Sequence, residues 1–201
     1  PESSHHEEGP GQNEIDFRFS DPLTAADNAV TFKSVVKTIA ARNGLYADFT
    51  PKPIADMPGN SFHINISARG LLNERDLSAN IVAGIINRIS DMTVFMNPDD
   101  ESYMRLGRNK APEYITWSPE NRSQLIRIPA ADGEYKRIEL RSPDPMANPY
   151  IAYALLIYAG VCGIENNEFP PDAANINLFS ASEEEKANYK KLPKSKTEAA
   201  E

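Results

Sequence analysis

Apolar residues recur at the spacing of an α-helix in three stretches of the chain. The first stretch follows Asp21-Pro22, a cap and a first-turn proline, and ends at Gly44. The second covers residues 77–95, and the third covers residues 149–161 and ends at Gly163. We predict a helix for each stretch. The inward positions of the first two helices are Phe32, Val35, Val36, Ile39 and Ala40, then Ile81, Ile85, Ile86, Ile89 and Met92.

Strict alternation of polar and apolar residues, which is typical of a half-buried strand, marks four shorter stretches. They are residues 14–19, 61–67, 123–129 and 136–142. The last two flank a turn that contains Asp132-Gly133, so they predict a hairpin. Residues 46–50 predict one more short strand, and residues 99–121 predict a loop with at most a short strand. A capping-box pattern at residues 182–185 predicts the start of the last helix.

Together these elements predict an α+β fold, in which helices cover one face of a largely antiparallel sheet. A chain of 201 residues can bury one sizeable core, so we expect residues 1–201 to form a single domain. The strand at residues 61–67 has one apolar face and one polar face, as the lining of a ligand site would. The apolar face comprises Phe62, Ile64 and Ile66, and the polar face comprises His63, Asn65 and Ser67.

Composition narrows the range of functions. Apolar residues make up 40% of the chain and charged residues 25%, as in an ordinary globular protein. The formal net charge of −8 leaves no basic surface, so we expect no nucleic-acid partner. No apolar run is long enough to span a bilayer, so we expect no membrane partner. The single cysteine, Cys162, excludes an intrachain disulfide and fits a reducing compartment, so we expect a cytoplasmic protein.

The segment at residues 5–14 gathers two imidazoles and three carboxylates around a Gly-Pro-Gly turn. Mg²⁺ and Mn²⁺ prefer carboxylate oxygens, and an imidazole suits the softer end of that series. A turn between Glu7 and Glu14 would bring both carboxylates to one ion. The alternative is an acidic run that is merely solvated.

Charged residues alternate on the last predicted strand, where Arg137, Glu139 and Arg141 share one face. Because burying an unpaired charge is very costly, such a face needs partners. It is either a salt-bridged sheet edge or a metal-bound carboxylate between two guanidiniums that bind anions. Arg122 and Arg127 lie an odd number of positions apart, so they cannot both point inward along one regular strand. We therefore expect Arg122 in the loop before that strand and Arg127 within it.

Five segments, in the same order, resemble the motifs of type I glutamine synthetases. They are His5-His6-Glu7 with Gly11-Gln12-Asn13-Glu14, residues 58–63, residues 121–129, residues 137–145, and Asn148-Pro149-Tyr150. The resemblance covers nearly the whole chain and implies the C-terminal part of a glutamine synthetase/guanido kinase-like catalytic domain. It also implies that the N-terminal β-grasp domain and the first part of the catalytic domain are absent.

The activity that this resemblance implies is ATP-dependent ligation. The γ-carboxylate of glutamate attacks the γ-phosphate of ATP, and ammonia then attacks the γ-glutamyl phosphate. Mg²⁺ or Mn²⁺ neutralises the crowded oxyanions, and arginines stabilise the phosphoryl group in transfer. The implied partners are glutamate, ammonium and ATP, and the intact parent is expected to be a homo-oligomer in the form of a double hexameric ring. The fragment alone is expected to be inactive.

Position by position, the resemblance assigns a role to each candidate residue. The implied metal ligands are Glu7 and Glu14 for a first ion, and His63 and Glu139 for a second. The implied substrate-binding residues are Gly59, Arg105, Arg122 and Arg141, of which Arg122 and Arg141 are also catalytic. The implied nucleotide-binding residues are Asn65, Ser67, Arg127 and Arg137. His5 and His6 match histidines beside the ligands, and His6 is expected to support them or to lie near the nucleotide.

Three residues depart from the family pattern. Lys110 stands where the family usually has an acidic residue that shields the intermediate and helps to deprotonate ammonium. Either another carboxylate, such as Glu113, takes that role, or the second substrate is not ammonium. Pro58 replaces a frequent asparagine. Phe179 replaces a tyrosine that many bacterial members modify, so we expect no nucleotidylation there.

Two alternatives remain open. The first is a γ-glutamyl-amine ligase of the polyamine type, which Lys110 keeps in consideration. The second is a non-catalytic binding or assembly module that retains the fold. Retention of four converging metal ligands counts against the second alternative, because an inactive site has no physical need for them.

Overall fold

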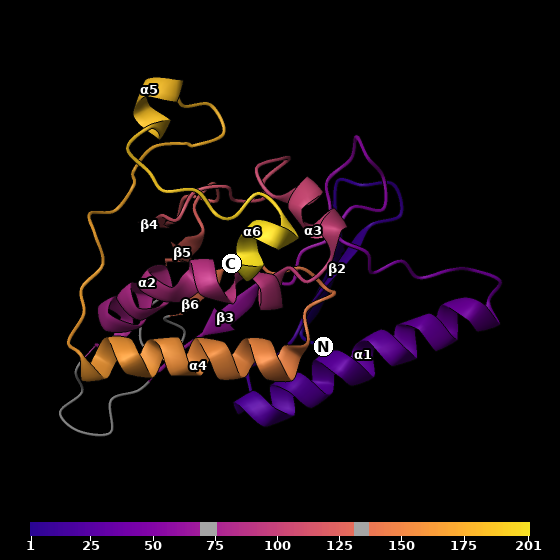
Figure 1. Cartoon of the computed structure of the whole chain (residues 1–201). Coiled ribbons are helices and arrows are strands. Elements are labelled where there is room, and N and C mark those ends of the chain that lie inside the picture. The colour runs from indigo at the N-terminus through magenta and orange to yellow at the C-terminus, as the bar shows by residue number, and fades with distance from the viewer. Residues whose placement is uncertain (69–75, 131–136) are drawn as a thin grey trace.

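The computed structural model of the chain describes residues 1–68, 76–130 and 137–201. Its main sheet has four short strands in the order β3-β6-β5-β4 (Figure 1). The strands are β3 (Ile64–Ile66), β4 (Trp117–Pro119), β5 (Ile126–Ile128) and β6 (Ile138–Leu140). Strand β6 pairs antiparallel with β3 and β5, whereas β4 pairs parallel with β5. The predicted α+β fold and the pairing of the two predicted hairpin strands, β5 and β6, are confirmed.

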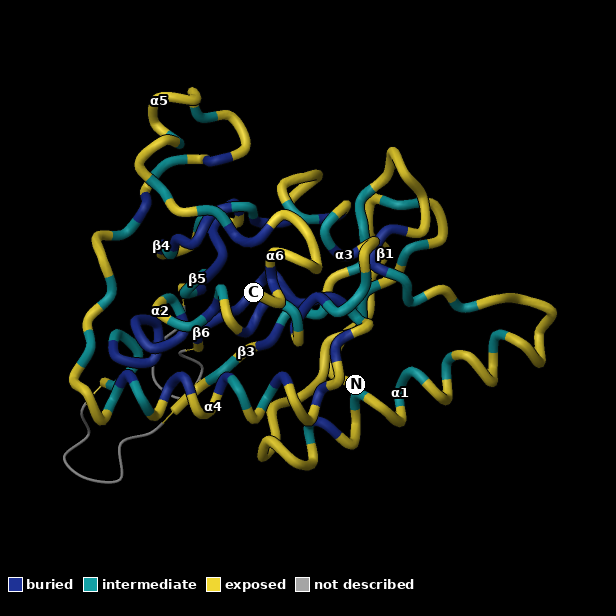
Figure 2. Tube along the Cα trace, in the orientation of Figure 1, coloured by how far each residue is buried: buried dark blue, intermediate teal, exposed yellow. Residues whose placement is uncertain are grey.

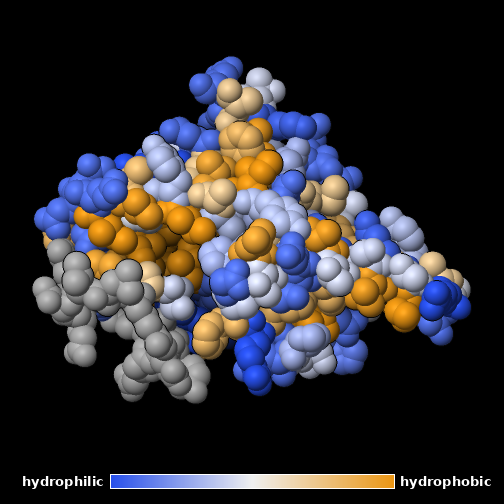
Figure 3. All heavy atoms as spheres, turned by 90° about the horizontal axis from the view of Figure 1, so that it is seen from below, coloured by the Kyte–Doolittle hydropathy of each residue, from blue (hydrophilic) through white to orange (hydrophobic). Residues whose placement is uncertain are grey.

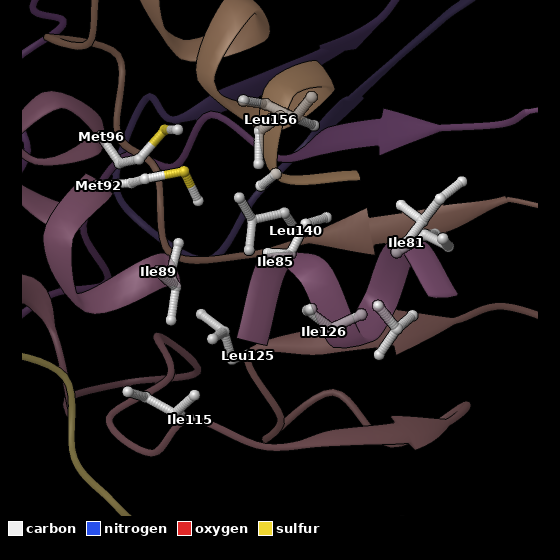
Figure 4. Close-up of a cluster of buried hydrophobic side chains, with 14 of the residues drawn as sticks. Ile81, Ile85, Ile89, Met92, Met96, Ile115, Leu125, Ile126, Leu140 and Leu156 are labelled. Carbon is white, nitrogen blue, oxygen red and sulfur yellow. The ribbon is translucent and has the colours of Figure 1, made fainter. Parts of the chain in front are cut away.

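Helix α2 (Ser78–Met96) packs on one face of this sheet, and helix α4 (Pro149–Glu165) packs along α2. The predicted inward stripe of α2 is confirmed, since Ile85 and Ile89 are fully buried and Ile86 packs at the edge of the core. Figure 4 shows the side chains of this core converging from the helices and the strands. The labelled members are Ile81, Ile85, Ile89, Met92, Met96, Ile115, Leu125, Ile126, Leu140 and Leu156.

Glycines allow α2 and α4 to approach very closely. A Cβ atom on Gly84 of α2 would lie 2.0 Å from the carbonyl oxygen of Ala159, and one on Gly163 of α4 would lie 2.1 Å from that of Asn80. The prediction that Gly163 ends its helix is therefore wrong, because α4 continues to Glu165. This glycine serves a close helix crossing instead of a helix end.

Helix α1 (Pro22–Arg42) begins as predicted, with the Asp21 side chain accepting a hydrogen bond from the Thr24 N–H at 3.0 Å. Its predicted inward stripe is wrong in part, because Val35 is 52% exposed and Ile39 is 50% exposed. Figure 2 shows that most of α1 is exposed or half-buried. Seen from below, apolar side chains gather over both α4 and α1 (Figure 3).

The remaining elements are short. They are β1 (Ser3–His6), β2 (Asn13–Asp16), α3 (Asp100–Arg105), α5 (Glu183–Lys186) and α6 (Lys196–Ala200). Helix α3 corrects the predicted loop at residues 99–121, because a capping box at Asp99 and Ser102 starts a short helix there. Residues 46–50 form no strand, and the predicted last helix is the single turn α5, with α6 after it. None of the described helices is both long and apolar enough to cross a membrane.

Candidate active site

The face of the sheet opposite the core is polar and charged. Asn65 on β3, Glu139 on β6 and Arg127 on β5 are direct partners in the strand register, so they form a row across three strands. Alternation along the strands puts His63, Arg137 and Arg141 on the same face. The predicted polar face is thus assembled from segments that are far apart in the sequence, and its apolar counterpart faces α2.

Glu139 is the centre of this face. Its side chain is buried and contacts Arg127 Nη1 at 2.9 Å, Arg141 Nη1 at 2.5 Å and His63 Nδ1 at 3.4 Å. Burial alone would raise the pKa of Glu139, but the positive charges of Arg141 and Arg127 bring that pKa below its ordinary value. The carboxylate therefore stays ionised. Its contacts are those of a salt-bridged face, which the sequence left open as the alternative to a metal-bound carboxylate.

His63 is held neutral. Burial, and then the positive charge of Arg141, lower the pKa of His63 to about 3. A neutral imidazole is the form that can coordinate a metal ion. His63 and Glu139 consequently offer one nitrogen and one carboxylate at adjacent positions of the sheet.

A second group of potential ligands lies on the β1–β2 hairpin. His5 pairs with Glu14 in the register of the two strands, and His5 Nε2 lies 3.2 Å from Glu7 Oε1 and 3.7 Å from Glu14 Oε2. Ligand atoms of all three residues lie within 4.8 Å of one another. Partial burial, followed by the charges of Asp16 and Glu7, raises the pKa of Glu14, as expected where carboxylates crowd together. His6 is not part of this group.

Gln12 ties this hairpin to the segment that carries Gly59. Its side-chain nitrogen donates to the carbonyl oxygen of Gly59 at 3.1 Å and to the Asn60 side chain at 2.9 Å. Gly59 itself has no room for a side chain, because a Cβ atom would lie 2.3 Å from the carbonyl oxygen of Pro51. Sequence spacing contains no signal for this Gln12 bridge, since its partner lies 47 residues away.

Arg105 is fully buried and forms hydrogen bonds with the backbone just after β6. Its guanidinium donates to the carbonyl oxygens of Ser142 at 2.8 Å and Arg141 at 3.2 Å, and to the Ser61 hydroxyl at 2.8 Å. Burial lowers the pKa of Arg105 to about 10, which still leaves it charged at neutral pH. The Nε atoms of Arg105 and Arg141 are both buried and donate to no described residue.

Arg122 lies in the turn before β5, as predicted, and is exposed. Its positive charge contributes to lowering the pKa of His63 and of Arg141, so it acts on the same polar face. Arg137 is also exposed and donates from Nε to the Asn65 side chain at 3.2 Å. Ser67 follows β3 and is exposed.

The segment that carries Lys110 folds against the β1–β2 hairpin. The Lys110 ammonium bonds to the Glu8 carboxylate. Asn109 and Lys110 both adopt positive φ values, of 52° and 77°, which non-glycine residues rarely do. Glu113, the alternative carboxylate, pairs with Lys191 at 2.6 Å. The acidic residue beside Lys110 is therefore Glu8, which sequence reasoning did not single out.

Comparisons with known proteins agree on one family. The model of the glutamine synthetase catalytic domain matches residues 1–201. The glutamine synthetases of Clostridium saccharobutylicum and Methanosarcina mazei are each 45% identical over 197 residues. Each match covers 92% of this chain and 44% of the relative, so the chain spans less than half the length of these curated relatives.

Solved structures show the same likeness. The ADP complex of GmaS in its first conformation superposes with a TM-score of 0.87 at 32% identity, and covers 98% of this chain and 49% of that one. The GmaS structure without ligand has a TM-score of 0.83 at 32% identity, and covers 98% of this chain and 48% of that one.

Proposed function

The chain belongs to the glutamine synthetase catalytic-domain family, and on that premise we propose that it supplies part of the active site of an ATP-dependent ligase. In a protein of the relatives' full length, this ligase joins ammonia to the γ-carboxyl group of glutamate through γ-glutamyl phosphate. The observation that carries the proposal is the polar sheet face. There a buried carboxylate, a neutral imidazole and several guanidiniums gather around Glu139.

The residues present fit a divalent metal. The hairpin group of His5, Glu7 and Glu14 provides carboxylate oxygens and one nitrogen within reach of a single ion. His63 and Glu139 provide a second nitrogen and carboxylate. We assign Glu7 and Glu14 to one Mg²⁺ or Mn²⁺ ion, and His63 and Glu139 to another, because these donors suit that end of the metal series. The bound ions would neutralise negative charge on phosphate and carboxylate oxygens.

The arginines fit two anionic substrates. The guanidiniums of Arg105, which lies against Gly59, and of Arg141 suit the carboxylate of glutamate. Arg122, Arg127 and Arg137 suit the phosphates of ATP, and the fold-level likeness to an ADP complex supports a nucleotide at this fold. Asn65 and Ser67 complete the nucleotide-binding set.

These residues contribute to the reaction by positioning the two substrates and by stabilising negative charge. Arg122 and Arg141 hold the γ-phosphoryl group and the γ-carboxylate of glutamate next to each other, which lowers the entropic part of the barrier. Their guanidiniums then stabilise the charge that develops on the phosphoryl oxygens during transfer. Glu139 balances the positive charge of Arg127 and Arg141, so these two guanidiniums are already paired before the substrates arrive.

The intact protein is proposed to be a cytoplasmic homo-oligomer, a double hexameric ring whose sites need residues outside these 201. The test uses a protein of the relatives' full length and measures ADP formation that requires both glutamate and ammonium. An Arg141→Lys variant should lose about 100-fold or more in kcat/KM, because a bidentate donor is lost. Arg42→Lys at the exposed end of α1 is the matched control and should behave as the wild type.

Three outcomes separate the possibilities. ADP formation that depends on both substrates and falls in Arg141→Lys supports the ligase. Turnover by the 201 residues alone would overturn the idea that the site is composite. Failure of the full-length protein to bind Mn²⁺ or ATP would revive the non-catalytic module.

A γ-glutamyl-amine ligase is the second candidate, and the pairing of Lys110 with Glu8 favours it. This pair neutralises the carboxylate that lies beside the loop, so the loop does not present a free negative charge to ammonium. Rates with ammonium, methylamine and a polyamine on the full-length protein distinguish the two ligases. A Lys110→Glu variant should shift the preference toward ammonium, and an unchanged preference would remove the support for this candidate.

A further inference from the structure

An extended segment at residues 171–178, between α4 and α5, runs beside strand β4 and the turn before β5 (Figure 1). We refer to these residues as the strap. The Ala174 N–H donates to the carbonyl oxygen of Trp117 at 2.9 Å, and the Trp117 side chain donates to the carbonyl oxygen of Pro171 at 2.7 Å. The strap is thus bonded to β4, although it forms no regular strand.

Three side chains from the turn before β5 form further hydrogen bonds with the strap. Asn121 Nδ2 donates to the carbonyl oxygen of Ile176 at 2.7 Å. Gln124 Nε2 donates to the same oxygen at 2.8 Å and to that of Ala174 at 3.0 Å. The Leu178 N–H donates to the Ser123 hydroxyl at 2.9 Å.

The bonds from Gln124 to Ala174 and from Leu178 to Ser123 are buried, and those from Asn121 and Gln124 to Ile176 are partly buried. Gln124 is fully buried, and Ser123 is only 2% exposed. The side-chain oxygen of Gln124, Oε1, also accepts a hydrogen bond from the Thr116 hydroxyl, so both the oxygen and the nitrogen of the side-chain amide are hydrogen-bonded. Because a buried amide without partners is costly, the strap cannot leave this position without a large loss of stability.

Arg122 lies in the sequence between Asn121 and Ser123, which both form hydrogen bonds with the strap. Asn121 Oδ1 also accepts bonds from the backbone N–H of Ser123 at 3.0 Å and from its hydroxyl at 2.9 Å, which closes the turn around Arg122. Among the described residues, none forms a hydrogen bond or an ion pair with the Arg122 side chain. The backbone of the turn therefore sets where the Arg122 side chain begins, and the bonds to the strap hold that turn.

We propose that the strap positions Arg122 for catalysis, and that Asn121, Ser123 and Gln124 are positioning residues. This inference rests on the proposed function, in which Arg122 contacts the phosphoryl group. A displacement of about 1 Å in such a contact can lower the rate on the order of 100-fold. The position of the strap therefore affects the rate of catalysis as well as the stability of the fold.

The test uses the full-length protein with Gln124→Met, which keeps volume but removes both donors to the strap. Thr93→Val is the matched control, because it removes a different buried bond, to the carbonyl oxygen of Ile89 at 2.7 Å, that does not involve the strap. Asn121→Asp is a second variant, which keeps the bonds to Ser123 and loses the donor to the strap. Hydrogen exchange of the peptide at residues 170–180 reports whether the strap has loosened.

We expect Gln124→Met and Asn121→Asp to speed exchange in the strap and to lower kcat by about 10- to 100-fold. The KM for glutamate and the Mn²⁺ affinity should stay within about twofold, a split that general destabilisation would not produce. Thr93→Val should leave strap exchange and kcat unchanged.

Two results would overturn the inference while the proposed function stands. One is a loosened strap with wild-type kcat, and the other is a reduced kcat without faster exchange in the strap. A wild-type protein without ligase activity would instead overturn the proposed function, and this inference with it.

Discussion

Glu139 on β6 lies directly opposite Arg127 on β5, and their side chains are joined at 2.9 Å on the polar face of the sheet. The same carboxylate also contacts Arg141 from two positions along its own strand. One buried anion therefore balances two buried or half-buried cations. This arrangement has a direct consequence for stability.

Glu139→Gln should destabilise the chain by about 3–5 kcal/mol, because it leaves Arg127 and Arg141 without their counter-charge. Glu183→Gln is the control, since Glu183 pairs with Lys186 at 3.0 Å but is 86% exposed. The control should change the free energy of unfolding by less than about 0.5 kcal/mol. Urea unfolding of the 201-residue chain at neutral pH measures both. Equal effects in the two variants would show that the Glu139 cluster is no more than a surface ion pair.

Sequence alternation predicted this face well. The period of two put His63 with Asn65, and Arg137 with Glu139 and Arg141, before any strand pairing was known. Alternation could not provide the register that sets Glu139 between Asn65 and Arg127, because register depends on how separate strands meet. It also contained no sign of the Gln12 bridge or the Glu8–Lys110 pair, which join segments distant in sequence.

The two adjacent histidines of β1 should differ in metal binding. His5 lies with Glu7 and Glu14, whereas His6 lies outside that group. We expect His5→Gln to weaken Mn²⁺ binding about 10-fold, the scale typical of a lost ligand or of a residue that orients one. His6→Gln should leave the affinity unchanged. Calorimetric Mn²⁺ titration of the full-length protein compares them, and a larger loss in His6→Gln would reverse the assignment.

The crossing of α2 and α4 distinguishes two glycines that are three residues apart on α4. A Cβ on Gly163 would lie 2.1 Å from the carbonyl oxygen of Asn80, whereas one on Gly160 would have Ile81 Cγ2 as its nearest neighbour, at 3.4 Å. Gly163→Ala should therefore destabilise the chain by about 1–3 kcal/mol or more. Gly160→Ala should be neutral or stabilising by up to about 1 kcal/mol, since alanine favours a helix. Thermal and urea unfolding report the difference, and similar values for both variants would argue against the close crossing.

Gly163 and α1 show where sequence patterns fail for physical reasons. A glycine after an apolar run is typical of a helix end, but here the neighbouring helix backbone requires it. The stripe of α1 is truly periodic, yet periodicity cannot say what lies against it. Val35 and Ile39 of that stripe are about half exposed, whereas Phe32 packs against Phe17 and Phe49. Helix α3 escaped prediction because six residues are too few to show a helical period.

Glu168, just after α4, should make stability depend on pH. Its carboxylate accepts bonds from both terminal nitrogens of Arg88, at 2.8 and 3.0 Å, and from Asn87 at 2.8 Å. These hydrogen bonds lower the pKa of Glu168 to about 2, below the ordinary value near 4.5. A carboxyl group with a lower pKa in the folded state stabilises the fold above the unfolded pKa, and this contribution is lost as the pH falls from about 4.5 to about 2.

Glu168→Gln should therefore be less stable than the wild type at pH 7, and more than half of the difference should be gone at pH 3. A double-mutant cycle with Arg88→Met, measured by urea unfolding at both pH values, isolates the pair. A difference that does not change with pH would mean that packing, and not charge, joins Glu168 to α2.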